Sequence, residues 1–163
     1  MPPQAPSLKG RALRLLSTRE YSRVELAHRL KPHAAQPAEL EALLDEMQAK
    51  GFVSEQRVVE SVLHRRAGKL GATRIRQELL DKGLAPETVR GAVANLQATE
   101  LERAREVWRK KFGASMPVDA SPGTANATTL ARQVRFLAQH GFGSDTIRRV
   151  VVAPADTPDQ MPD

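Results

Sequence analysis

The sequence predicts an all-α protein built from tandem three-helix-bundle repeats, with three modules and nine helices in an elongated, curved array. Apolar residues recur at helical spacing along the chain, and no segment shows sustained period-two alternation. A helix-to-helix junction occurs twice, which indicates one supersecondary unit used more than once. Aromatic residues make up only 4 % of the 163 residues, so leucine, valine and alanine must form most of the hydrophobic core. Such a core suits small modules that are stabilised by contacts with neighbouring modules.

The repeated junction covers residues 77–90 and 135–148. When Gly83 is aligned with Gly141, the surrounding apolar positions coincide in four pairs: Leu79 with Leu137, Leu84 with Phe142, Val89 with Ile147, and Val93 with Val151. A glycine just past a helix accepts the left-handed conformation that ends the helix, and the apolar residue after it folds back onto the last turn. A third glycine junction, at Gly51, falls at a different phase of the pattern, so we expect it to join two modules.

Helix starts are marked by residues that satisfy free backbone amides. Ser22 with Glu25, and Thr99 with Glu102, have the spacing of a capping box. Ser144 is expected to cap the last helix. Together with the apolar spacing, these signals predict helices at residues 9–17, 23–30, 37–50, 55–69, 72–82, 86–97, 100–112, 128–140 and 145–152. The expected apolar stripe of the eighth helix consists of Leu130, Val134, Leu137 and Ala138.

The nine helices divide into three groups of three. We therefore expect modules at residues 9–51, 52–98 and 99–152, with a flexible insertion at 113–127 that is rich in Gly, Ala, Ser and Pro. Residues 1–8 and the acidic tail at 153–163 lack periodicity and are expected to be disordered.

Composition narrows the class of protein. The formal net charge of +6 favours an acidic partner or proximity to nucleic acid, although a general bias towards arginine would raise it as well. The chain has no cysteine, which excludes disulfides and thiolate metal sites. Because no apolar run approaches the roughly 20 residues that span a bilayer, we expect a soluble, cytoplasmic protein. We also expect a monomer.

No convergent catalytic chemistry is visible in the sequence. The four histidines lie in different helices or loops and lack the spacing of metal ligands. Neither a P-loop nor a dinucleotide-binding glycine motif is present. We therefore predict no enzymatic activity, no metal and no cofactor.

Basic residues form the most informative cluster for function. Positive charges gather where the fourth helix ends and the fifth begins, and again in the last module. The candidate partner-binding residues are Arg65, Arg66, Lys69, Arg74, Arg76, Arg132, Arg135, Arg148 and Arg149. Taken singly, each is expected to be a solvated surface residue, and Arg74 has the spacing to pair with Glu78. Their concentration at one junction favours a partner that neutralises them.

Two hypotheses follow from these features. Residues 72–97 have the form of a helix-turn-helix whose second helix would enter a DNA major groove. That helix begins with Pro86, Glu87 and Thr88, however, which places a carboxylate opposite the phosphates. The alternative is an interaction module that lies along a protein surface, and the recurrence of the unit favours it.

The order of short motifs along the chain resembles the bacterial RecX regulators. The matching segments are residues 12–16, 21–26, 50–55, 74–83 and 135–142, within a resemblance that runs from about Lys9 to Val152. This resemblance implies tandem three-helix modules lodged in the groove of a RecA–DNA filament. It also implies inhibition of the ATP hydrolysis, strand exchange and coprotease activity of RecA, without chemistry of the chain's own. Weak direct binding to DNA is the accompanying possibility.

Overall fold

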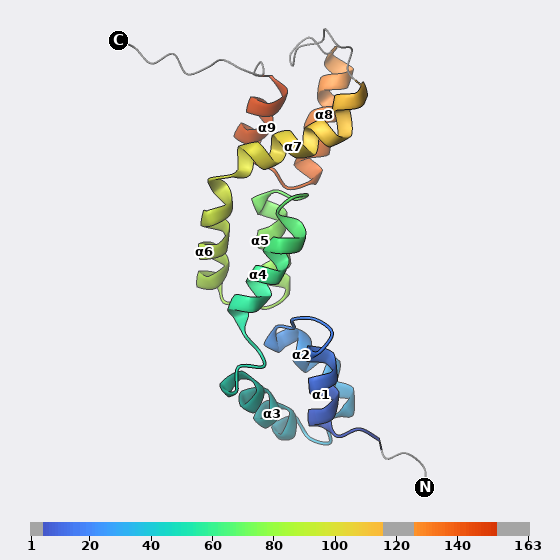
Figure 1. Ribbon diagram of the computed structural model, residues 1–163, viewed down its shortest axis with the longest axis vertical. Coiled ribbons are helices and arrows are strands. Elements are labelled where there is room, and N and C mark those ends of the chain that lie inside the picture. The colour runs from blue at the N-terminus through green and yellow to red at the C-terminus, as the bar shows by residue number, and fades with distance from the viewer. Residues whose placement is uncertain (1–4, 116–125, 153–163) are drawn as a thin grey trace, which may run out of the picture. The chain divides into compact units, whose positions relative to one another are not determined.

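The computed structural model describes residues 5–115 and 126–152, which are almost entirely helical (Figure 1). These residues form nine α-helices and two short 3-10 helices, with no strand. The elements are α1 (Leu8–Leu16), α2 (Arg23–Leu30), η1 (Lys31–His33), α3 (Pro37–Ala49), α4 (Glu55–Arg66), α5 (Ala72–Asp81), α6 (Pro86–Gln97), α7 (Glu100–Phe112), η2 (Gly113–Ser115), α8 (Ala127–Gln139) and α9 (Ser144–Val151). The all-α prediction is confirmed, and the nine helices lie where the sequence places them.

The helix ends differ from the prediction mainly at α4, which ends at Arg66 and not at Lys69. The predicted tail at 153–163 and residues 1–4 of the predicted disordered N-terminus lie outside the described residues. The prediction of disorder through residue 8 is wrong at its end, because Ser7 caps α1 and Leu8 is the first residue of that helix. The predicted insertion falls mostly on residues 116–125, which also lie outside them; its first residues form η2, and Ala127 begins α8.

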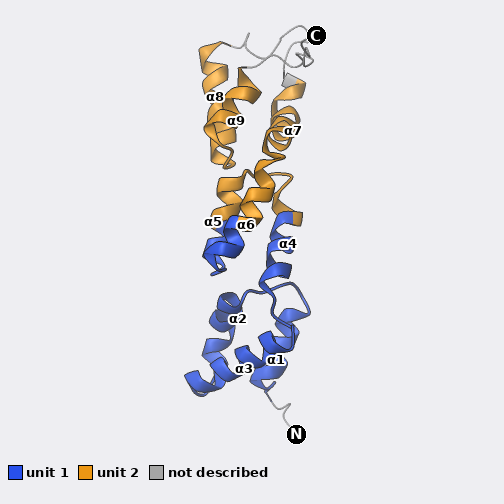
Figure 2. Cartoon of the chain, turned by 90° about the vertical axis from the view of Figure 1, so that its left-hand side faces the viewer, with its two compact units in different colours: residues 1–63, 78–90 blue, residues 64–77, 91–163 orange. Residues whose placement is uncertain are grey.

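The chain divides into two compact units, coloured separately in Figure 2. Unit 1 comprises residues 1–63 and 78–90, and unit 2 comprises residues 64–77 and 91–163. Helices α4, α5 and α6 contribute residues to both units, and each helix changes colour along its length in Figure 2.

The core of unit 1 lies where α1, α2 and α3 meet. Its buried side chains are Ala12, Tyr21, Leu26, Leu30, Leu40, Leu43, Leu44, Met47 and Val53. Full burial of one leucine or methionine side chain contributes about 1.5–3 kcal/mol, so a small module can fold around a few of them.

The core of unit 2 is formed by α7, α8 and α9. Its buried side chains are Ala104, Val107, Leu137, Phe142, Ile147, Val150 and Val151. Aromatic rings extend this core, with Phe112 and Phe136 in a T-shaped pair whose centroids are 5.2 Å apart. Four of the chain's few aromatic residues therefore gather in this unit, where Trp108 packs against the same cluster.

The repeated glycine junctions have the same backbone geometry. Gly83 has a φ of 75° and Gly141 a φ of 85°, both in the left-handed region. The amide after each glycine donates to a carbonyl in the preceding helix: Leu84 to Leu79 at 3.3 Å, and Phe142 to Leu137 at 3.2 Å. This bonding is the Schellman motif, and it turns Leu84 and Phe142 into the interior, as the sequence predicts.

Both repeat glycines also pack closely against the start of an earlier helix. A Cβ on Gly141 would lie 2.6 Å from the backbone nitrogen of Arg74 in α5, and a Cβ on Gly83 would lie 2.4 Å from Val24 in α2. Gly51 has the same left-handed φ, 75°, but a Cβ there would meet nothing within 4 Å. The Gly51 junction thus ends a helix without making the contact that the other two share.

Backbone polar atoms complete these contacts. The amide of Gly71 donates to the carbonyl of His140 at 2.8 Å, and the amide of Thr73 donates to the carbonyl of Gly141 at 3.2 Å. At the corresponding place in unit 1, the hydroxyl of Ser22 donates to the carbonyl of Lys82 at 2.5 Å. The carbonyl next to each repeat glycine therefore binds the N-terminus of the helix against which that glycine packs.

Of the three predicted helix caps, one is present in the structure and two are not. The capping box of Ser22 and Glu25 is confirmed, since both of its hydrogen bonds are present. The box at Thr99 and Glu102 is wrong, because Thr99 has a φ of −109° and a ψ of 3° and makes no cap bond. Its hydroxyl instead donates to the carbonyl of Leu96 and accepts from Arg103. Ser144 is not the cap of α9 either: it is the first helical residue, and Gly143 occupies the cap position.

The stripe predicted for α8 is only partly correct. Leu137 is fully buried, but Val134 is 39 % exposed and Ala138 is exposed. Gln133, the residue before Val134, takes the buried position with 3 % exposure. Val134 and Ala138 instead border an open apolar cavity of about 480 Å³ between α8 and α9.

Candidate partner-binding surface

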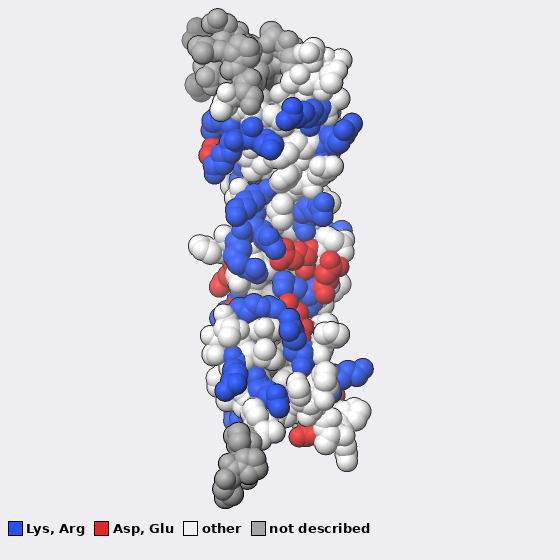
Figure 3. All heavy atoms as spheres, turned by 90° about the vertical axis from the view of Figure 1, so that its right-hand side faces the viewer, with Lys and Arg blue, Asp and Glu red and all other residues white. Residues whose placement is uncertain are grey.

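All nine candidate residues belong to unit 2. Arg65 and Arg66 end α4, Lys69 lies in the following turn, and the others lie on α5, α8 and α9. Eight of the nine are exposed, and only Arg66 is half-buried. Figure 3 draws one face of the molecule, on which basic side chains cover much of the surface and acidic ones are fewer.

One contact links the two sequence clusters of basic residues, at the joint between α5 and α8. Arg74 Nε donates to the carbonyl of Gln139, the last residue of α8, at 2.9 Å. A cation at this end of a helix is favourable because the free carbonyls there carry partial negative charge. Arg135 lies one turn before Gln139 on the same helix. Through Arg74, the first cluster therefore adjoins the end of the helix that carries Arg132 and Arg135.

The candidate cations differ in the contacts that their side chains make within the protein. Arg74 is held by Gln139, Arg148 pairs with Asp145 at 2.5 Å, and the guanidinium of Arg132 lies 5.8 Å from the centroid of the Phe112 ring. Within the described residues, no side-chain hydrogen bond or ion pair engages four others: Lys69, Arg76, Arg135 and Arg149. These four have the most capacity for an acidic partner.

One residue that the sequence analysis did not single out, Arg103, holds the first cluster in place. Its guanidinium donates to the carbonyls of Ala67 and Leu70, both at 2.8 Å, and to that of Leu96 at 3.1 Å. Burial lowers the pKa of Arg103, although Glu100 opposes the shift. Arg103 lies on α7 and binds the turn that follows α4. It therefore fixes the backbone that carries Lys69. Nothing in the sequence separates it from the exposed arginines around it.

The start of α6 is poorly suited to reading DNA. The carboxylate of Glu55 accepts a hydrogen bond from the Thr88 hydroxyl at 2.9 Å and one from the Ala85 amide at 3.4 Å. With Glu87 in the first turn, two carboxylates lie at this helix end. A helix that enters the major groove should present base-reading groups there, and Thr88 is already bonded to Glu55.

The described residues contain neither a cluster of potential metal ligands nor a helix that could span a membrane. Within residues 5–115 and 126–152, no three His, Asp or Glu side chains group as a metal site would require. Among the same residues, no helix has both the length and the apolar character to cross a bilayer.

The fold and its exposed cations define a repeat protein of three-helix modules with a basic surface. Two family models match it: the second three-helix domain of RecX at residues 54–93, and the third three-helix domain of RecX at residues 98–151. The chain belongs to the RecX family of regulatory proteins.

Individual relatives agree with this assignment over most of the chain. The regulatory protein RecX of Leptothrix cholodnii is 54 % identical over 145 residues, which cover 89 % of this chain and 87 % of the relative. That of Ralstonia pickettii is 41 % identical over 151 residues, covering 93 % of this chain and 90 % of the relative. The crystal structure of RecX from Lactobacillus salivarius has the same fold, with a TM-score of 0.71 at 16 % identity, covering 88 % of this chain and 92 % of that one.

Proposed function

We propose that this chain binds the RecA recombinase and the RecA–DNA nucleoprotein filament in the cytoplasm. There it inhibits the ATP hydrolysis, strand exchange and coprotease activity of RecA during DNA repair and the SOS response. The relatives are named regulatory proteins, and the resemblance to their family implies this partner. In this proposal the chain acts as a monomer and contributes no chemistry of its own.

The observation that carries the proposal is the basic surface of unit 2. Lys69, Arg76, Arg135 and Arg149 are exposed, and within the described residues their side chains have no hydrogen-bonding or ionic partner. A nucleoprotein filament offers phosphates and carboxylates in a regular array, and arginine suits the planar geometry of both groups. Several weak contacts repeated along such an array add up through avidity.

The proposal is tested by titrating the protein into RecA, single-stranded DNA and ATP while ATP hydrolysis is followed. The wild type should slow hydrolysis, and the double variant Arg76→Glu/Arg135→Glu should need about tenfold more protein for half inhibition, because each reversal replaces attraction by repulsion. The matched control is Lys31→Glu/Arg90→Glu, which changes the net charge equally through two exposed residues of unit 1. Circular dichroism establishes that both variants are folded.

Two results would contradict the proposal. If the folded Arg76→Glu/Arg135→Glu variant inhibited as well as the wild type, the basic surface would not be the contact. If the wild type left hydrolysis unchanged, RecA would not be the target, and the DNA-binding alternative would need testing. That alternative predicts tight binding to bare duplex DNA with an affinity that falls steeply as salt is added.

A further inference from the structure

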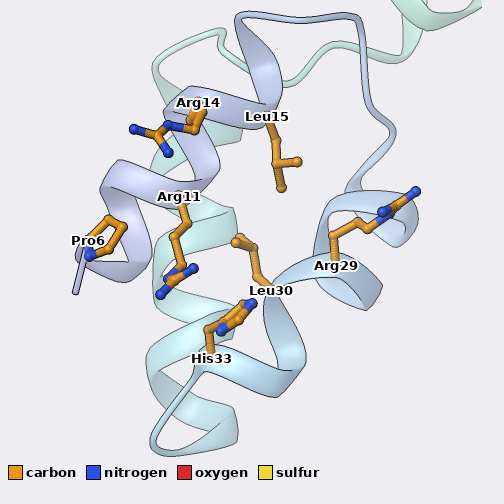
Figure 4. Close-up of a pocket in the computed structure, with 7 residues that line it drawn as sticks. All are labelled: Pro6, Arg11, Arg14, Leu15, Arg29, Leu30 and His33. Carbon is orange, nitrogen blue, oxygen red and sulfur yellow. The ribbon is translucent and has the colours of Figure 1, made fainter.

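Unit 1 contains a small cavity between α1 and α2 that the basic surface of unit 2 does not include. Its volume is about 230 Å³. Pro6, Leu15 and Leu30 provide its apolar wall, Arg11, Arg14 and Arg29 provide its cationic lining, and the imidazole of His33 completes it. In Figure 4, Arg11 reaches towards His33 near the centre of the view, while Arg14 and Arg29 extend outward on opposite sides. Among the described residues, no carboxylate lines this cavity.

The arginines of this cavity differ from others in the same unit. Arg19 pairs with Glu25, Arg23 pairs with Glu41 and Asp45, and Arg57 pairs with Glu20. By contrast, no described residue forms a hydrogen bond or ion pair with the side chains of Arg11, Arg14 or Arg29. Arg14 and Arg29 are exposed and Arg11 is partly buried, so the three guanidinium groups remain available to an anionic occupant of the cavity.

Size and lining decide between a peptide and a nucleic acid. Sites for drug-sized ligands measure roughly 300–1,000 Å³, so this cavity suits one apolar side chain and not a whole nucleotide. Proteins that bind single strands stack successive bases on several aromatic side chains, whereas among the described residues only one ring, that of His33, lines this cavity. A peptide with carboxylates on either side of one leucine-like side chain matches this cavity, because the leucine suits the apolar wall and the carboxylates suit the arginines.

We propose that this cavity binds a short acidic peptide segment of a partner protein, with one apolar side chain against Leu15 and Leu30 and flanking carboxylates on the arginines. The site lies wholly in unit 1. It does not depend on the function proposed for the basic surface of unit 2.

The test uses the full chain and a fluorescein-labelled peptide, Asp-Glu-Leu-Glu-Asp, followed by fluorescence anisotropy. The peptide should bind the wild type, and its affinity should fall about tenfold for Arg11→Gln/Arg14→Gln/Arg29→Gln as charge-assisted contacts are lost. A peptide with serine in place of leucine should also bind about tenfold more weakly, because the apolar contact is lost. The matched control, Arg105→Gln/Lys110→Gln/Lys111→Gln on α7, should bind the first peptide within about twofold of the wild type.

Amide chemical shifts of the labelled wild-type protein locate the peptide. Shifts confined to the residues around Arg11, Leu30 and His33 support the proposal. It is overturned if the peptide does not bind, if the serine peptide binds equally well, or if the triple variant retains full affinity. An oligothymidylate that binds more tightly than the peptide and shifts the same amides would make the cavity a nucleic-acid site instead. If the triple variant fails to fold, Arg29→Gln alone and the serine peptide still decide the outcome.

Discussion

The carboxylate of Glu100, the first residue of α7, accepts a hydrogen bond from the hydroxyl of Thr146 in α9 at 3.1 Å. Glu55, the first residue of α4, accepts the same kind of bond from Thr88 in α6 at 2.9 Å. In both cases the glutamate begins one helix and the threonine is the third residue of the helix that follows a repeat glycine. The repeat therefore extends beyond the glycine junction to a polar contact between the ends of two helices. Glu100 also accepts from the Ala72 amide at 3.0 Å.

Removing the hydroxyl at this contact should destabilise unit 2. Thr146→Val keeps the shape of the side chain but leaves one oxygen of a half-buried carboxylate without its donor, so we expect a loss of about 1 kcal/mol in the free energy of unfolding. Thr128→Val, at an exposed position near the start of α8, should stay within about 0.5 kcal/mol of the wild type. Urea denaturation measures both variants, and equal stability of the two would contradict the assigned role of Thr146.

The three left-handed glycines should respond differently to alanine. Gly51→Ala should cost about 1–2 kcal/mol, because the left-handed conformation alone is unfavourable for other residues. Gly141→Ala should cost clearly more, since its Cβ would also lie 2.6 Å from the Arg74 nitrogen. Gly91→Ala, inside α6 with open space around it, should raise stability by about 0.5–1 kcal/mol. Thermal denaturation gives the order, and a Gly141→Ala protein as stable as Gly51→Ala would refute the contact.

Glu25 should make the stability of unit 1 depend on acidity. Burial would raise its pKa, but hydrogen bonds from Lys82, the Ser22 amide and Arg19 lower it below its ordinary value of 4.5. A lowered pKa in the folded state gives stability that is fully present above pH 4.5 and lost as the pH falls through the folded pKa. At neutral pH, Glu25→Gln should cost about 1–3 kcal/mol, because Lys82 loses its charged partner.

This difference between wild type and Glu25→Gln should shrink as the pH falls below 4.5. Unfolding at a series of pH values measures it, and a constant difference down to pH 3 would show that the charge of Glu25 is not the cause. Glu41→Gln is a suitable control, because this carboxylate is largely exposed in its pair with Arg23.

Arg103 should not tolerate replacement by lysine. Its fork of donors binds three carbonyls at once, and a single ammonium group cannot reproduce that geometry. Arg103→Lys should therefore cost about 1–3 kcal/mol, whereas Arg105→Lys at the exposed face of α7 should stay within about 0.5 kcal/mol. Chemical denaturation distinguishes them, and hydrogen exchange at the Lys69 amide should speed up only in the first variant. If exchange there is unchanged, Arg103 does not hold that turn.

The helices and glycine junctions could be predicted from the sequence because their determinants are local. The spacing of Leu40, Leu43, Leu44 and Met47 specifies a buried face without reference to any other helix. The capping box at Ser22 is local as well. The residues at Thr99 and Glu102 have the same capping-box pattern. The Thr99 hydroxyl, however, donates to the Leu96 carbonyl and accepts from Arg103, and the capping-box pattern predicts neither contact.

The candidate surface was less accessible to prediction, because it depends on which residues meet across helices. Spacing along α5 suggests Glu78 as the partner of Arg74, whereas the structure shows Arg74 Nε donating to the carbonyl of Gln139, which lies 65 residues away. In α8, Gln133 is buried and Val134 is exposed, because the packing of α7 and α9 determines which side of the helix faces inward. Such choices between neighbouring residues require the tertiary structure.

The joint at Gly141 is made chiefly of main-chain atoms: the Gly71 and Thr73 amides donate to the His140 and Gly141 carbonyls. Every amino acid except proline supplies such an amide, and every residue supplies a carbonyl. The joint therefore requires little of the surrounding side chains beyond the absence of a Cβ at positions 71 and 141. A gene duplication that copied one helical unit would also copy the glycine and the main-chain groups that form this joint. A chain of this kind can therefore gain a unit without new side chains evolving at the contact.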